Sequence, residues 1–274
     1  MSARALSTLL KSGPIVVPTA FDMMAARIIA GSGFPAVFCS GYGQAASALG
    51  RPDDGSLTLN HLVMRAEAMA ESVDVPVLVD ADTGFRDPAE TGRRLAAAGA
   101  SAVMIEDQIA AKRCGHVPGK TVVSLDEMLG RIDGVVRGCG GDALVIARTD
   151  ALEPLGLQEA LRRGRRCAEA GADVVFVEAP ESLEALRAIP AGLPCPAMAN
   201  MLAGGRTPQL TVAEFSELGF GVIVFGLLDL MLAARALRDG FADLAETGDL
   251  SRLRTPLLGF DELNDLTGLT KRAG

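Results

Sequence analysis

Acidic residues stand directly after short apolar runs of the sequence. Asp80 and Asp82 follow the run 77–79, and Glu106 follows the run 103–105. If the first run continues as an extended strand, side chains two residues apart point to the same side and can converge with Glu106 on the next strand. Carboxylates without histidine or thiolate beside them favour a hard cation, Mg²⁺ or Mn²⁺, over zinc or copper. Because magnesium keeps several waters, we expect one or two of these acids to bind it through water.

Four other apolar runs also end in polar residues. The residues at these ends are Ser40, Arg148 with Asp150, Glu178 and Asn200. Any one of them could be a solvated loop residue or a helix cap, and Arg148 could pair with an acid. Six runs that end in the same way favour one shared polar site.

A second group of reactive residues lies in the segment 108–121, which has neither helical nor strand periodicity. The string Lys112-Arg-Cys-Gly-His116 surrounds Cys114 with cationic groups, which favour the thiolate and lower the pKa of a thiol. Such a thiol suits acid/base or nucleophilic chemistry. The other four cysteines stand in or next to apolar patterns, where we expect packing. The five cysteines are an odd number without Cys-x-x-Cys, which argues against a disulfide framework or a zinc site.

The spacing of glycines indicates which elements position these residues. Gly31, Gly99, Gly171 and Gly219 each follow a helical pattern and precede an apolar run, as left-handed caps do before buried parallel strands. The first three stand 68 and 72 residues apart, about twice the length of one strand-helix-strand unit. Further runs fill the gaps, so eight strands are expected. They are residues 15–18, 36–40, 76–79, 102–106, 143–147, 174–178, 195–199 and 222–225.

Eight strand-helix units in about 250 residues predict an α/β fold, a (β/α)8 TIM-type barrel with its site at the carboxyl ends of the strands. An open doubly wound sheet is the runner-up, although no Gly-x-Gly-x-x-Gly follows a strand. We expect one barrel domain over residues 1–274, with 227–274 as a C-terminal helical extension. This extension would cap the barrel or pack on a partner.

Composition excludes several classes of protein. With 49% hydrophobic and 22% charged residues, the chain has enough apolar surface for a folded core. A net charge of −8, no tryptophan and one tyrosine argue against a nucleic-acid partner. Glycines, prolines and Asp229 interrupt the longest apolar stretches, so we expect no membrane span. No secretory signal is recognisable, which favours a cytoplasmic location.

Four strings, in order at successive strand ends, resemble the isocitrate lyase and phosphoenolpyruvate mutase superfamily. They are Asp80-Ala-Asp-Thr-Gly-Phe85, Glu106-Asp-Gln108, Lys112-Arg-Cys-Gly-His116 and Ala147-Arg-Thr-Asp150. The resemblance runs over about residues 13–266. Three more strings are similar to the short lyases (2,3-dimethylmalate lyase, petal death protein and methylisocitrate lyases) rather than to the longer isocitrate lyases. They are Ser40-Gly-Tyr-Gly43, Ala199-Asn-Met201 with Gly204-Gly-Arg-Thr-Pro208, and Phe260-Asp-Glu-Leu-Asn264.

The resemblance implies a barrel whose C-terminal helix is exchanged between subunits of a dimer, with two dimers forming a homotetramer. It implies Mg²⁺ (or Mn²⁺) as the cofactor and a small organic acid as the substrate. By motif, Asp80 and Asp82 match the metal acids, with Glu106 and Asp53 acting through water. Substrate-binding positions match Ser40, Gly41, Tyr42, Gly115, His116, Arg148, Glu178 and Asn200. Catalytic positions match Cys114, as acid/base thiol, and Arg148; Tyr42 is a candidate base.

The expected function is a Mg²⁺-dependent carbon–carbon lyase. It would cleave a 2-hydroxy dicarboxylate or tricarboxylate, similar to 2-methylmalate or 2-methylisocitrate, into a 2-oxo acid and a carboxylate. Two alternatives use the same scaffold: a carboxyphosphonoenolpyruvate mutase-type enzyme and an oxaloacetate-cleaving enzyme. An alternative of another class is a catalytically inactive metabolite-binding barrel. Intact Asp80, Asp82 and Cys114 argue against that last alternative.

Overall fold

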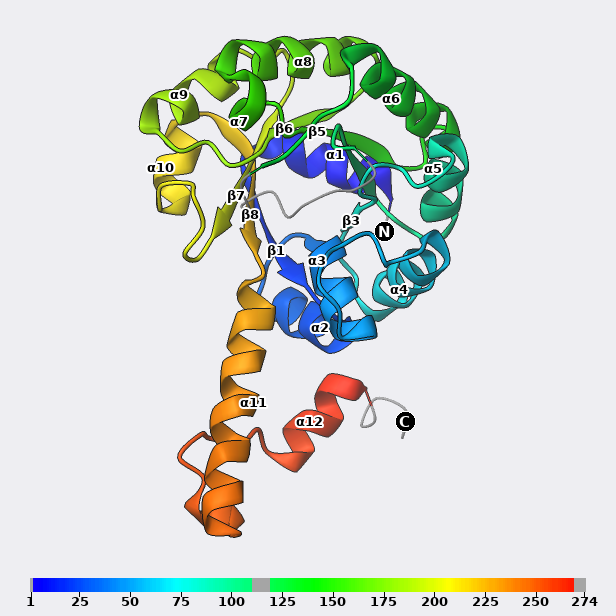
Figure 1. Cartoon of the computed structure of the whole chain (residues 1–274). Helices are drawn as coiled ribbons and strands as arrows, with labels where there is room; N and C mark the ends of the chain where they lie inside the picture. Colours follow the sequence, from blue (N-terminus) through cyan, green and yellow to red (C-terminus); the bar gives the residue numbers. More distant parts are fainter. Residues whose placement is uncertain (1, 110–118, 269–274) are drawn as a thin grey trace.

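Eight parallel strands form a closed barrel in the order of the chain (Figure 1). The structure is a computed structural model and describes residues 2–109 and 119–268. The strands are β1 (Ile15–Ala20), β2 (Val37–Cys39), β3 (Val77–Asp80), β4 (Ala102–Glu106), β5 (Leu144–Thr149), β6 (Val174–Val177), β7 (Ala197–Leu202) and β8 (Phe220–Gly226). Because β1 pairs with both β2 and β8, the sheet has no edge. The predicted barrel is confirmed, and the doubly wound alternative is wrong.

Helices between the strands surround the barrel (Figure 1). Those of the barrel are α2 (Met23–Gly31), α3 (Gly41–Gln44), α4 (Leu59–Ser72), α5 (Pro88–Ala97), α6 (Leu125–Cys139), α7 (Leu152–Leu155), α8 (Leu157–Glu169), α9 (Leu183–Ala191) and α10 (Val212–Glu217). A π-helical turn, η1 (Ala45–Leu49), follows α3. Gly99, Gly171 and Gly219 have positive φ after their helices as expected, whereas Gly31 ends α2 and Gly33 takes the positive φ.

Side chains alternate along each strand between two apolar clusters. Leu78, Met104 and Phe176 belong to a cluster inside the barrel, whereas Val79 and Ile105 belong to a cluster between the strands and the outer helices. Helix α1 (Ala3–Ser12) contributes Leu6 to the inner cluster, next to residues near the strand starts. The inner cluster therefore fills the barrel from its amino-terminal end.

The alternation decides where the polar strand ends point. In β4, Met104 faces inward, so Glu106 faces inward and Asp107 outward. In β5, Ile146 faces inward, so Arg148 follows inward and Thr149 outward. The same alternation along the strand makes the residues at the ends of β2, β3, β6 and β7 face inward. These residues are Ser40, Asp80, Glu178 and Asn200.

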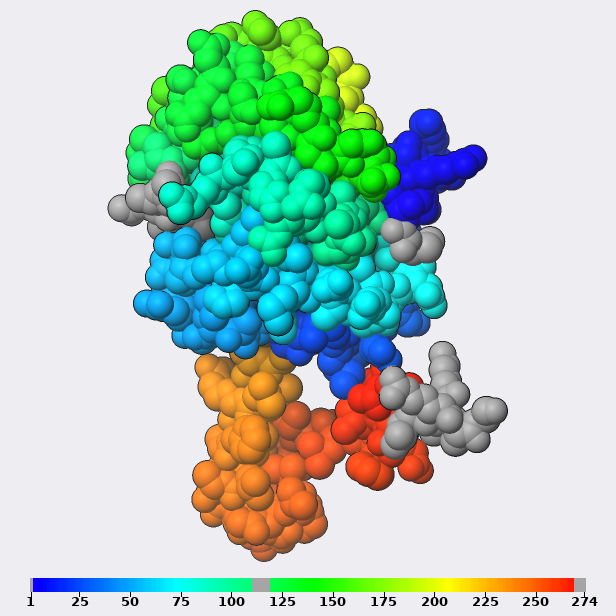
Figure 2. Space-filling view, turned by 90° about the vertical axis from the view of Figure 1, so that its right-hand side faces the viewer, coloured from blue at the N-terminus to red at the C-terminus, as the bar shows by residue number. Residues whose placement is uncertain are grey.

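The chain beyond β8 leaves the barrel. Leu227 has a φ of 57°, and this left-handed residue separates β8 from α11 (Leu228–Thr247), which projects from the barrel (Figures 1 and 2). A 3-10 turn, η2 (Leu250–Arg252), and α12 (Phe260–Thr267) follow, and α12 turns back toward α2. Within the described ranges, no helix is both long and apolar enough to cross a membrane.

Helices α5 and α6 touch through glycines. A Cβ on Gly138 would lie 2.1 Å from the carbonyl oxygen of Ala89, and one on Gly92 would lie 2.7 Å from that of Val135. The backbones therefore approach more closely than any side chain would allow.

We expect Gly138→Ala to lower the free energy of unfolding by about 1–3 kcal/mol, because the methyl group would push the two helices apart. Gly130→Ala, on the exposed side of the same helix with nothing within 4 Å, is the matched control and should raise stability by about 0.5–1 kcal/mol. Urea denaturation of both variants measures the difference. Equal stability of the two variants would contradict the close contact.

Candidate active site

A cavity opens at the carboxyl ends of the strands, where barrels of this type hold their sites. Its walls carry eight of the residues singled out in the sequence, and Phe38, Met104 and Phe176 form its apolar floor. Those eight residues are Ser40, Tyr42, Asp53, Asp80, Glu106, Arg148, Glu178 and Asn200. The structure thus brings together residues from the ends of β2 to β7 and from the segment after η1.

Asp80 and Asp82 converge beside Gly41. A Cβ on Gly41 would lie 3.0 Å from Oδ1 of Asp82 and 3.2 Å from Oδ2 of Asp80, so any larger residue here would press on both carboxylates. The amide of Asp82 also donates to Oδ1 of Asp80 at 3.1 Å. The expected route was wrong: β3 ends at Asp80, and Asp82 follows in a turn with a φ of 53°. The turn, not a continued strand, brings the second carboxylate back.

The donor set suits a hard cation. Asp80 lines one side of the cavity and has the Asp82 carboxylate beside it, whereas Glu106 lies against Arg148, with Oε2 3.3 Å from Nε. Among residues 2–109 and 119–268, no three His, Cys, Asp or Glu side chains form a group that could hold a metal by themselves. Two carboxylates completed by water are the arrangement that Mg²⁺ usually takes. Roles for Glu106 and Asp53 through water stay predictions.

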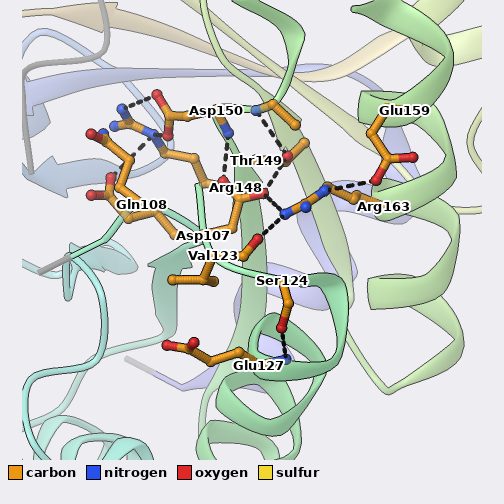
Figure 3. A network of polar contacts seen from close by, with 12 residues as sticks. Asp107, Gln108, Val123, Ser124, Glu127, Arg148, Thr149, Asp150, Glu159 and Arg163 are labelled. Atoms are coloured by element: carbon orange, nitrogen blue, oxygen red, sulfur yellow. Dashed lines mark hydrogen bonds and ion pairs between the residues drawn. The ribbon is translucent and has the colours of Figure 1, made fainter. Parts of the chain in front are cut away.

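Arg148 is the charged centre of the site (Figure 3). Its Nε and Nη2 donate to the two carboxylate oxygens of Asp150 at 2.9 and 3.0 Å. Nη2 also lies 3.1 Å from Oε2 of Glu178, and the guanidinium lies 5.7 Å from the ring centre of Phe176. Burial by itself lowers the pKa of Arg148, but the facing carboxylates hold that pKa well above its ordinary value. The group is therefore a fixed positive charge.

Outward-facing residues at the same strand ends form a second network, which the sequence did not reveal (Figure 3). Asp107 accepts hydrogen bonds from the hydroxyl of Thr149 at 2.6 Å, the amide of Asp150 at 2.8 Å and Nη1 of Arg163 at 3.0 Å. Burial raises the pKa of Asp107. Arg163 also donates to the carbonyl of Val123. The pairing therefore fixes the end of β5 against α8.

Lys120 was missed as well, although it lies within the segment 108–121 that holds the reactive string. Its side chain is fully buried, and its ammonium lies 3.4 Å from Oδ1 of Asp150 and 3.6 Å from Oε2 of Glu153. Antiparallel pairing of Gln108 with Val122 brings the two sides of this segment together. Cys114, Gly115 and His116 lie outside the described residues, and their roles stay predictions.

Cys39, Cys139 and Cys167 are packed as expected. All three are buried, and burial raises the pKa of their thiols to about 12, 11 and 12. Cys195 is half-buried, and burial raises its pKa too. These four thiols are therefore poor candidates for the reactive cysteine.

Ser40 and Tyr42 approach the cavity from the turn after β2. The Ser40 hydroxyl accepts a hydrogen bond from the amide of Gly43 in α3, and Tyr42, the second residue of α3, lines the cavity. Gln44, fully buried behind them, donates to the carbonyl of Ala20 and accepts from Nε of Arg65 at 2.6 Å. The hydrogen bonds of Gln44 therefore hold this turn in place on the side away from the cavity.

A β/α barrel with paired aspartates, a buried arginine and a small cavity at its carboxyl ends has the features of a barrel enzyme acting on a small organic anion. The family model described as phosphoenolpyruvate phosphomutase matches residues 6–245. The chain belongs to this family, within the phosphoenolpyruvate mutase and isocitrate lyase superfamily.

Individual relatives agree with this assignment. The 2,3-dimethylmalate lyase of Eubacterium barkeri is 41% identical over 94% of this chain and 90% of its own length. A solved structure of 2,3-dimethylmalate lyase has a TM-score of 0.93 at 36% identity, covering 99% of this chain and 93% of its own. Oxaloacetate acetylhydrolase in complex with the product oxalate has a TM-score of 0.92 at 33% identity, covering 99% and 95%. Phosphonopyruvate hydrolase with oxalate and Mg²⁺ has a TM-score of 0.88 at 28% identity, covering 99% and 96%.

Proposed function

We propose that the protein is a Mg²⁺-dependent carbon–carbon lyase that cleaves a 2-hydroxy dicarboxylate or tricarboxylate into a 2-oxo acid and a carboxylate. The observation that carries this proposal is the cavity in which Asp80 and the buried Arg148 face the same space, with Asp82 beside Asp80. One side suits a hard cation and the other an anionic substrate. The cytoplasmic location stays a prediction.

Different residues of the site would bind the metal ion and the substrate. Asp80 and Asp82 would hold Mg²⁺, which when bound supplies positive charge to the oxygen of the developing 2-oxo acid. Arg148 attracts a substrate carboxylate, because the facing carboxylates keep its guanidinium charged despite burial. Ser40 and Asn200 on the cavity wall offer neutral hydrogen bonds, and the apolar floor limits water.

Proton transfers complete the reaction. A base takes the proton of the substrate hydroxyl, for which Tyr42 on the cavity wall is the candidate. The bond between carbons 2 and 3 then breaks, and its electron pair stays on carbon 3 of the leaving carboxylate. Cys114 gives its thiol proton to that carbon. The substrate beyond this core is a methyl-substituted malate or isocitrate, in line with the activity named for the Eubacterium relative.

Chelation of divalent cations should abolish release of the 2-oxo acid, because the expected metal site consists of oxygen ligands. Mg²⁺ or Mn²⁺ should restore turnover, whereas Zn²⁺ should not substitute well. The assay uses 2,3-dimethylmalate, 2-methylisocitrate, oxaloacetate and phosphonopyruvate in parallel. Full activity after exhaustive chelation would remove the metal from the proposal.

Replacing Cys114 by serine should lower turnover at least about 100-fold, because a hydroxyl is a far weaker acid than a thiol. Binding of oxalate with Mg²⁺ should survive, since those contacts come from other strand ends. Steady-state kinetics on the same substrates give the comparison. A rate within about threefold of wild type corresponds to a change in the activation barrier of under about 1 kcal/mol. Such a rate would exclude the thiol from the mechanism, and with it the lyase proposal.

The C-terminal helix supports a proposal about assembly. Helix α11 exposes apolar side chains to solvent, among them Leu232 at 62% and Phe241 at 65% exposure. The N-terminal part of α11 and helix α2 line an apolar groove, to which Met24, Ile28 and Leu232 contribute. Exposed apolar surfaces of this kind are typical of interfaces. We infer that α11 packs on a second copy, as in the helix-exchanged dimer, with two dimers forming a homotetramer.

Light scattering should therefore report a tetramer, or at least a dimer. Leu232→Ser should weaken the assembly, because it removes an apolar side chain from the groove, whereas Ala234→Ser on the same helix, outside the groove lining, should change it less. Sedimentation at several concentrations compares the two variants. A stable wild-type monomer at micromolar concentration would refute the exchange.

A further inference from the structure

The buried ammonium of Lys120 has no part in the reaction proposed above. Its side chain has no exposed surface, although removing an unpaired ammonium from water is costly. Two acids surround it: Oδ1 of Asp150 at 3.4 Å and Oε2 of Glu153 at 3.6 Å. The second acid is only partly buried, whereas the Asp150 carboxylate is wholly buried. Asp150 is therefore the partner that depends on Lys120 most.

Asp150 links Lys120 to the substrate site. Its Oδ1 accepts from Nη2 of Arg148 and also faces the Lys120 ammonium, while its Oδ2 accepts from Nε of Arg148. Burial by itself raises the pKa of Asp150, and the two cations lower it, so that the group is ionised. Asp150 thus stands between two cations, of which only Arg148 lines the cavity.

The charge balance around Arg148 explains why a second cation is needed. Glu106, Asp150 and Glu178 all lie within 3.3 Å of its guanidinium. Without Lys120, Arg148 alone would have to offset the buried Asp150, and one more uncompensated negative charge would lie directly behind the cavity wall. Both effects would oppose the binding of an anion.

We propose that Lys120 is a positioning residue that fixes the Asp150 carboxylate and thereby keeps the Arg148 guanidinium directed at the substrate anion. This inference rests on the proposed function, in which Arg148 binds a substrate carboxylate. Lys120 acts through Asp150 and touches no substrate. Glu153 is its second anchor and also accepts from the amide of Gly119 and from Arg206.

The experiment measures the affinity for oxalate in the presence of Mg²⁺ by isothermal titration calorimetry. Lys120→Met, which keeps the length and loses the charge, should bind oxalate at least about tenfold more weakly than wild type. Asp150→Asn should also weaken binding. In the double variant, Lys120→Met should add no more than about a twofold loss to that of Asp150→Asn, because the lysine acts through the aspartate. Lys120→Arg should bind oxalate more tightly than Lys120→Met.

Two controls separate positioning from stability. Lys11→Met makes the same substitution at an exposed lysine in the last turn of α1 and should leave oxalate affinity unchanged. Met128→Ala removes a fully buried side chain of α6, so it should lower the melting temperature without a comparable loss of affinity. If Lys120→Met does not fold, Lys120→Gln carries the same expectation.

Oxalate affinity within twofold of wild type in the uncharged Lys120 variant would overturn the inference. Fully additive losses in the double variant would overturn it too, since they would show that Lys120 acts independently of Asp150. Wild-type protein that fails to bind oxalate would count against the anion site at Arg148. Failure of the lyase proposal appears elsewhere, as absence of turnover on the hydroxy acids, so the two failures are distinguishable.

Discussion

The guanidinium of Arg148 is buried at the carboxyl end of β5, and three carboxylates surround it. A buried charge is tolerable only when partners offset its lost hydration, so Glu106, Asp150 and Glu178 must all be held in place. Strand register meets part of this need: Glu106 stands opposite Arg148 in the β4–β5 pair, and Arg148 opposite Phe176 in the β5–β6 pair. The closed barrel thereby builds an ion cluster that no single strand contains.

The two faces of each strand end have different tasks. Inward-facing Glu106 and Arg148 meet the cavity, whereas their neighbours Asp107 and Thr149 face the helices and bond to each other. Arg163 of α8 joins the outer pair at 3.0 Å. The residues that line the cavity are therefore held by a second set one position further along the chain. A change in this outer set would displace the inner one, although the outer residues do not line the cavity.

The exit of the chain from the barrel is tied to the cavity wall as well. Thr19 lines the cavity, accepts from the amide of Leu227 and donates to Oδ1 of Asp229 at 2.8 Å. The amide of Phe21 donates to the other oxygen of Asp229 at 2.6 Å. Burial raises the pKa of Asp229 above its ordinary value, although these hydrogen bonds oppose the shift. The direction of α11 is thus set beside the cavity.

The sequence by itself determined the barrel and most of the site. Continuous apolar runs predicted buried parallel strands, and the polar residues after six of these runs predicted the cavity wall, because one register rule governs every strand of a barrel. The glycine spacing gave the number of units. These signals are local, so Ser40, Arg148 and Glu178 could be located without any knowledge of the fold.

Tertiary structure decided which of these residues meet. The turn with positive φ at Asp82 returns that carboxylate to Asp80. The sequence pattern suggested a continued strand and gave no sign of this turn. Glu106 pairs with Arg148 because β4 and β5 are in register, although its sequence position suggested the aspartates. Lys120 reaches Asp150 across 30 residues of chain. Contacts between distant strand ends depend on how the barrel closes, and no local pattern in the sequence encodes that geometry.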